Sequence, residues 1–74
     1  MKKDKTKPTA IHIRKLRKSL GLTQAKFADA IGVTKIAVAF WEGGYFTPIQ
    51  FNLEIIAEVF GCSVEWLKGK ENDA

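Results

Sequence analysis

The sequence predicts a single all-α domain built from five helices. Glycines divide the chain at intervals that suit short helices, with breaks at Gly21, Gly32, Gly43, Gly44 and Gly61. Between these breaks, apolar residues recur every three or four positions, which is the period of a helix with one buried face. A chain of 74 residues can form one compact domain with a small core, and it leaves no room for a second domain.

The first helix is expected from about Ala10 to Leu20, with Thr9 as its N-cap. Ile13, Leu16, Arg17 and Leu20 recur there at helical spacing. The other side of this helix is basic and carries Arg14, Lys15 and Lys18.

The second helix is expected to start at Thr23 and to end at Gly32. The third begins with Thr34 as its N-cap and ends near Glu42. A connection this short forces the two helices to cross at a steep angle, so small residues are needed where they meet. The side chains that we expect to face inward are Phe27, Ala28, Ile31, Val38 and Trp41.

The fourth helix is expected to open at Thr47, with Pro48 at its first position. Gln50 follows Thr47 by three residues, so the two could complete a capping box. Ser63 then caps a short fifth helix. The apolar residues expected on the inner faces of these two helices are Leu53, Ile56, Ala57, Phe60, Trp66 and Leu67.

Positive charge is concentrated at one end of the chain. The first 20 residues hold eight Lys or Arg against Asp4, a balance of +7, whereas residues 21–74 carry four against seven acids, a balance of −3. Residues 1–8 are therefore interpreted as a flexible basic arm, 9–69 as the folded domain and 70–74 as a tail. Such an arm either binds a polyanion such as a nucleic acid or is only a solvated end of the chain. Its lysines are Lys2, Lys3, Lys5 and Lys7.

Composition argues against several classes of protein. Cys62 is the only cysteine and His12 the only histidine, so we expect no disulfide within the chain, no metal and no other cofactor. Without a glycine-rich phosphate loop or a catalytic cluster, neither an enzyme nor a small-molecule substrate is expected. No apolar run approaches the roughly 20 residues of a membrane span, and we expect a cytoplasmic protein with no membrane partner.

The pattern around the second and third helices resembles a helix-turn-helix signature. Apolar residues stand where two helices must meet, alanine stands at the close contact, and Gly32 occupies the turn. The likeness extends over nearly the whole chain after the arm, through LRKSLGLTQAKFADAIGV, WEGG with Pro48 after it, and LEIIAEVFGCSVEWL. It is to the Cro/repressor-type (XRE-like) family of bacteria and their phages, and it implies a lambda-repressor-like five-helix fold.

The resemblance implies a transcriptional regulator that binds double-stranded DNA with its third helix in the major groove, and a homodimer on DNA is compatible with it. It implies that Gln24 contacts a DNA phosphate and that Arg17 pairs with Glu42. The N-terminus of the second helix would also offer backbone N–H groups and a positive dipole end to a phosphate. The full set of candidate phosphate-contacting residues is Thr23, Gln24, Lys26, Thr34, Gly44 and Tyr45.

A helical wheel of the third helix turns Val38 and Trp41 inward and places Ile36, Ala39, Phe40 and Gly43 outward, with Lys35 at the flank. The candidate base-contacting residues are Lys35, Ile36, Ala37 and Phe40. The family usually carries Gln, Ser, Arg or Asn where this chain has Ile36, Ala37 and Phe40, so this chain offers no bidentate base reader. Apolar side chains can still contact the 5-methyl group of thymine.

Two functions therefore remain open from the sequence. One is a small DNA-binding regulator that reads thymine methyls. The other is a helix-turn-helix scaffold used as a protein-interaction module for a repressor or toxin, because a cluster of Ile36, Phe40, Tyr45 and Phe46 also suits a protein-binding patch. Trp66 is similarly open, as a core or boundary aromatic residue or as a dimer contact.

Overall fold

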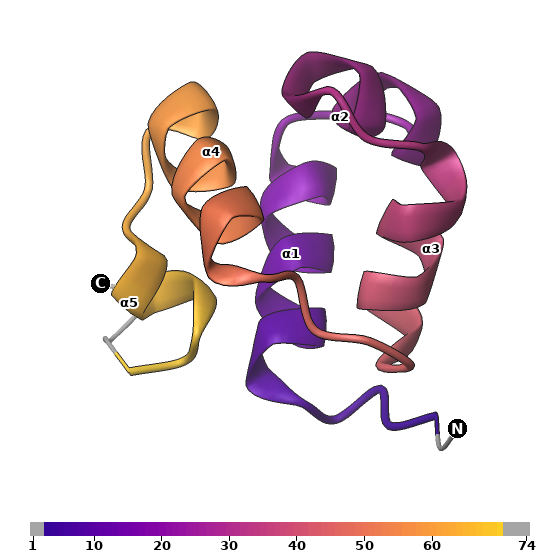
Figure 1. The fold of residues 1–74 in the computed structure, drawn as a ribbon, viewed down its shortest axis with the longest axis vertical. Coiled ribbons are helices and arrows are strands. Elements are labelled where there is room, and N and C mark those ends of the chain that lie inside the picture. Colours follow the sequence, from indigo (N-terminus) through magenta and orange to yellow (C-terminus); the bar gives the residue numbers. More distant parts are fainter. Residues whose placement is uncertain (1–2, 71–74) are drawn as a thin grey trace.

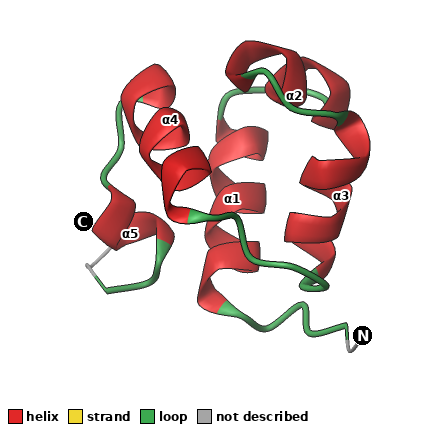
Figure 2. Ribbon diagram, in the orientation of Figure 1, coloured by secondary structure: helices red, strands yellow, loops and turns green. Residues whose placement is uncertain are grey.

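The computed structural model describes residues 3–70, which form helices joined by short loops (Figure 1, Figure 2). Across that part of the chain there is no strand, so the predicted all-α, five-helix fold is confirmed. None of the described helices is long and apolar enough to cross a membrane. Lys2 of the arm and residues 71–74 of the tail lie outside the described residues. The helices are α1 (Pro8–Ser19), α2 (Gln24–Ile31), α3 (Lys35–Gly43), α4 (Gln50–Phe60) and α5 (Val64–Leu67).

Helix α1 lies in the middle of the molecule, between α3 on one side and α4 and α5 on the other (Figure 1). It packs against α3 and α5, while α2 packs against α3 and α4. The residues before α1 pass close to the end of α3 (Figure 1). This arrangement leaves one side of α3 away from the core, next to the beginning of α2.

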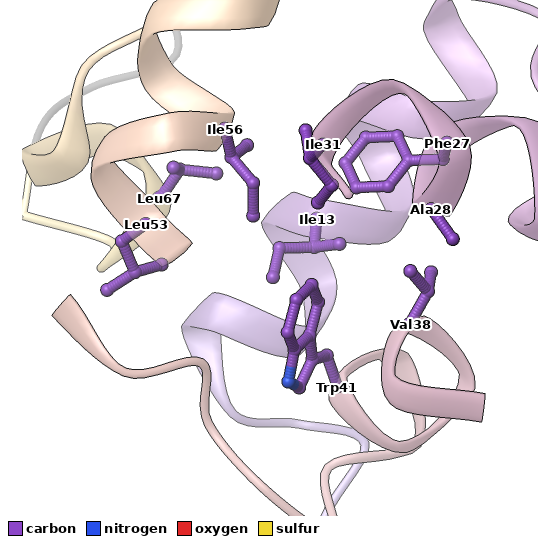
Figure 3. Packing of buried hydrophobic residues seen from close by; sticks show 9 residues of the cluster. All are labelled: Ile13, Phe27, Ala28, Ile31, Val38, Trp41, Leu53, Ile56 and Leu67. Carbon is purple, nitrogen blue, oxygen red and sulfur yellow. The ribbon is translucent and has the colours of Figure 1, made fainter. Parts of the chain in front are cut away.

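The core is contributed by all five helices (Figure 3). Its largest fully buried side chains are Phe27, Ile13, Ile56, Leu67 and Val38. Burying a side chain of this size contributes about 1.5–3 kcal/mol, so the fold of so short a chain rests on a few such contacts. Cys62 is partly buried and packs against this core, and burial raises the pKa of its thiol.

Three helix starts follow the sequence prediction. The hydroxyl oxygens of Thr23, Thr34 and Ser63 accept hydrogen bonds from backbone N–H groups three residues further along the chain, at Lys26, Ala37 and Trp66. Each bond satisfies one of the donors that a helix start leaves without a partner inside the helix. Gly32 and Gly44 end α2 and α3 in the left-handed conformation, at φ +75° and +77°.

The predicted starts of α1 and α4 are wrong. Helix α1 begins at Pro8 with Lys7 as its N-cap and no capping side chain, because proline at the first helical position needs no N–H partner. Helix α4 begins at Gln50, after Ile49, rather than at Thr47, and the expected capping box is not formed. Its residue Gln50 instead donates to Glu54 at 3.0 Å. Pro48 is buried in the connection from α3, so the start of α4 is set by packing.

Candidate nucleic-acid interface

Helix α3 has a buried pole and an exposed pole, as the helical wheel predicts. Val38 is 0% exposed and Trp41 is 6% exposed, and both face the core (Figure 3). Ile36 is 65% exposed and Phe40 is 37% exposed, and Lys35 is exposed as well. The exposed pole therefore presents an apolar surface, with a single cation at the start of the helix.

Ala37 lies differently from the other candidate base-contacting residues. It is partly buried and packs against the core, and its backbone N–H donates to the Thr34 hydroxyl at 3.1 Å. Ala39, which is partly exposed, borders a surface hollow beside the exposed pole. Of the four candidate base-contacting residues, Ala37 is thus the one that the outer face of α3 presents least.

Phe40 is covered in part by the loop that follows α3. Its ring meets Tyr45 and Phe46 edge-on, with ring centroids 5.5 and 5.4 Å apart. Such edge contacts are favourable because the positive rim of one ring faces the negative face of another. Phe46 remains 47% exposed, so the three rings form a supported aromatic cluster at the surface.

The ion pair that the resemblance implies is present, and it ties α1 to the end of α3. Arg17 Nε donates to Glu42 Oε2 at 2.6 Å and Nη2 donates to Oε1 at 2.9 Å. The same guanidinium donates through Nη1 to the Leu22 carbonyl at 2.8 Å. The two side chains are only 13% and 5% exposed, and the hydrogen bond to Glu42 holds the pKa of Arg17 above its usual range. Glu42 is thereby a structural carboxylate, not a solvated one.

Gln24, at the start of α2, belongs to the same network. Its Nε2 donates to Glu42 Oε1 at 3.2 Å, and the side chain is partly exposed. An amide nitrogen carries two hydrogens, so one of them remains for a ligand at the surface. Thr23 and Lys26 beside it are exposed, and the first N–H groups of α2 have no partner within the helix.

Gly44 is buried beneath the N-terminal arm. Its N–H donates to the Trp41 carbonyl at 3.2 Å, and its own carbonyl accepts from the Asp4 N–H at 3.3 Å. A Cβ atom at this position would lie 1.8 Å from the Asp4 carbonyl oxygen, so only glycine allows the approach. The expected phosphate-contacting position is thus occupied by the arm.

Three cations beside this region, Lys3, Lys5 and Arg14, belong to the basic arm and the basic side of the first helix noted in the sequence, but the set of candidate site residues did not include them. They border a hollow that Gln24 and Tyr45 also line. The available signal was the position of Arg14 one helical turn before Arg17, on the side of α1 that faces α3. The arm residues carried no such periodicity. No group of three or more His, Cys, Asp or Glu among residues 3–70 could hold a metal ion.

The geometry is that of a helix-turn-helix unit, in which two short helices joined by a glycine turn set one exposed helix face beside a helix N-terminus. Comparison with known proteins identifies the family, because the model of the helix-turn-helix family matches residues 13–67. The chain belongs to this family, and to its Cro/repressor (XRE-like) type.

Among curated proteins, the HTH-type transcriptional regulator DicA of Escherichia coli is 34% identical over 61 residues, which is 82% of this chain and 45% of DicA. An uncharacterized HTH-type transcriptional regulator of Haemophilus influenzae is 44% identical over 43 residues, or 58% of this chain and 18% of that protein. The chain thus spans less than half the length of either relative.

Among solved structures, the P22 c2 repressor in complex with a synthetic operator superposes with a TM-score of 0.81 at 29% identity, covering 89% of this chain and 100% of that one. A structure of HppE in complex with substrate gives a TM-score of 0.75 at 28% identity, and covers 86% of this chain but only 36% of that one. The same helical unit therefore also occurs as a part of longer proteins.

Proposed function

We propose that this protein binds double-stranded DNA as a transcriptional regulator, with α3 in the major groove. The observation that carries the proposal is the position of the exposed pole of α3 beside the N-terminus of α2. A groove-bound helix of this kind needs a phosphate anchor at its flank, and a helix N-terminus supplies N–H donors and a positive dipole end. Similarity to the operator-bound P22 c2 repressor supports the same docking.

Phosphate anchoring is assigned to residues around the two helix starts. Gln24 keeps one amide hydrogen for a phosphate, while Lys26 contributes an exposed ammonium. Thr23 and Thr34 accept capping bonds with their hydroxyl oxygens, which leaves the hydroxyl hydrogens to donate outward. Tyr45 would donate through its phenol group. Gly44 is left out of the proposed set of phosphate-contacting residues, because the arm covers it.

Base reading is assigned to Lys35, Ile36 and Phe40, with a minor part for Ala37. Apolar side chains favour contact with thymine methyl groups, and Lys35 can donate to guanine O6 or N7. Contacts with methyl groups discriminate less than a bidentate pair. The protein should therefore prefer thymine-rich half-sites with modest selectivity.

The alternative is a protein-interaction module that uses the same face. One observation favours it: Ile36, Phe40 and Phe46 are apolar, exposed and adjacent, which is the composition of an interface core. On either proposal the protein would act in the cytoplasm, without catalysis. A homodimer on DNA belongs to the first proposal, because paired half-sites match a two-fold protein.

A salt titration of duplex binding tests the first proposal. We expect affinity for a random duplex to fall steeply with salt, with a slope of about −0.9 for each phosphate neutralised. Selection from a random-sequence duplex pool should then enrich thymine at fixed spacing. A parent protein that binds no duplex even at low salt would remove the proposal and leave the protein-interaction module.

A further inference from the structure

An open hollow of about 290 Å³ lies where the arm, α1, the start of α2 and the end of α3 meet. Three exposed cations line it, Lys3, Lys5 and Arg14, together with Gln24, Glu42 and Tyr45. Its members come from segments far apart in the sequence. The hollow opens beside the exposed pole of α3, since Ala39 and Gly43 form part of its wall.

The charge in the hollow is unbalanced. Glu42 is the one acid among the described residues that line it, and Arg17 holds both of its oxygens at 2.6 and 2.9 Å. The charge of Glu42 is therefore already compensated by Arg17. The three remaining cations repel one another, and the closeness of Lys3, with a smaller effect of Arg14, lowers the pKa of Lys5.

The arm is held in this place by its backbone. The Asp4 N–H donates to the Gly44 carbonyl, and the Lys7 N–H donates to the Asp4 carbonyl, both at 3.3 Å. The Asp4 carboxylate accepts from the Thr6 N–H at 3.0 Å, which is a local turn of the kind that aspartate favours. Lys3 is carried over the Tyr45 ring, with its Nζ 5.8 Å from the ring centroid. The arm thus follows a defined path past Gly44.

We propose that this hollow binds one phosphate group, and that the docking of the arm on Gly44 completes the site. Two ammonium groups and a guanidinium supply charge and donors, and a guanidinium suits phosphate through its planar fork. The remaining amide hydrogen of Gln24 and the phenol of Tyr45 lie on the same wall. This inference rests on the proposed function when the phosphate belongs to a DNA backbone, and a free phosphate ion is the other source.

The first test measures the salt dependence of binding to a random duplex. Replacing Lys5 and Arg14 together by glutamine should make the slope of log K against log salt shallower by about one, since each phosphate neutralised contributes about 0.9 to the slope and the hollow binds one phosphate. Both side chains are exposed, so the variant should melt like the parent. Lys70→Gln removes an exposed charge at the other end of the described chain and should leave the slope unchanged.

The second test separates arm docking from charge. Gly44→Ala places a Cβ atom against Asp4 and should displace the arm, so the slope becomes shallower with every lysine still present. Gly61→Ala is the matched control, because it has the same left-handed backbone, φ +74° against +77°, with nothing within 4 Å of the added atom. It should carry the same backbone strain and keep the slope of the parent. Equal slopes for Gly44→Ala, the double variant and the parent would overturn the inference.

The source of the phosphate is decided by amide chemical shifts of Lys5, Arg14 and Tyr45. Saturable shifts with the duplex but not with inorganic phosphate at constant ionic strength assign the site to a DNA backbone. Saturable shifts with inorganic phosphate, lost in the double variant, support a site for free phosphate even if the parent binds no duplex, in which case only the proposed function fails. Duplex binding without shifts in the hollow would overturn the inference and leave the proposed function standing. No shifts with either ligand would overturn the inference as well.

Discussion

Two surfaces of different chemistry adjoin along the exposed pole of helix α3. On one side Ile36 and Phe40 present an apolar face, supported by the ring of Phe46. On the adjoining part of the same pole, Ala39 and Gly43 form the wall of a hollow bordered by Lys3, Lys5 and Arg14. The first surface carries almost no charge, whereas the second carries a local excess of positive charge.

This difference suggests a division of labour on DNA. Attraction between cations and phosphates is independent of base sequence and weakens with salt. Contacts between apolar side chains and base edges depend on sequence and respond little to salt. Affinity and selectivity should therefore be removable one at a time, and the network of Arg17 and Glu42 should support both.

The largest effect is expected from breaking the Arg17–Glu42 ion pair, which supports both surfaces. Glu42→Gln leaves Arg17 with a largely buried and uncompensated charge, so the free energy of unfolding should fall by about 3–5 kcal/mol. Thermal melts give the measurement, with Glu54→Gln as the control because its partner Gln50 lies in an exposed pair. A Glu42→Gln variant that melts like the parent would show that the pair does not support the two surfaces.

The next effect is expected on the apolar face. Phe40→Ala should weaken binding to a selected site by about 1–3 kcal/mol and relax the preference at a thymine, while binding to random duplex barely changes. Phe51→Ala is the control, because it removes an exposed ring from α4, away from α3; Phe51 is 65% exposed against 37% for Phe40. Melting curves of both variants show whether the edge contacts with Tyr45 and Phe46 matter for folding.

Loss of protein capture with unchanged duplex binding in Phe40→Ala would favour the protein-interaction module instead. An aromatic side chain at the centre of an interface can carry much of its binding energy.

A smaller effect is expected from removal of the arm. A chain without residues 2–7 should bind random duplex with a salt slope shallower by about one to three, because the lysines of the arm no longer neutralise phosphates. Selectivity between a selected site and random duplex should stay close to that of the parent. An unchanged slope would show that the arm is a solvated end, and that the lysines of the cationic surface do not neutralise DNA phosphates.

The smallest effect is expected at the cap of α3. Thr34→Ala should lower the free energy of unfolding by about 1 kcal/mol, because the Ala37 N–H loses its partner. Ser63→Ala, which removes the cap of α5 away from α3, should cost a similar amount in stability. Weaker duplex binding in Thr34→Ala alone would assign the Thr34 hydroxyl to a phosphate, and equal binding in both variants would limit it to capping.

Most of the fold could be predicted because its signals are local. Thr23, Thr34 and Ser63 cap the helices that follow them, and the helical period places Val38 and Trp41 in the core. The predictions failed where a distant part of the chain overrides a local signal. Thr47 and Gln50 have the spacing of a capping box, but the connection from α3 buries Pro48 and delays the start of α4.

The sequence by itself determined the helix-turn-helix unit, the apolar pole of α3 and the family, because periodicity, caps and motif spacing act within a few residues of one another. Tertiary structure alone decided that Gly44 receives the arm and that Lys3, Lys5 and Arg14 border one hollow with Gln24. Packing brings these residues together from separate segments, and no local pattern encodes the closeness of the Asp4 and Gly44 backbones.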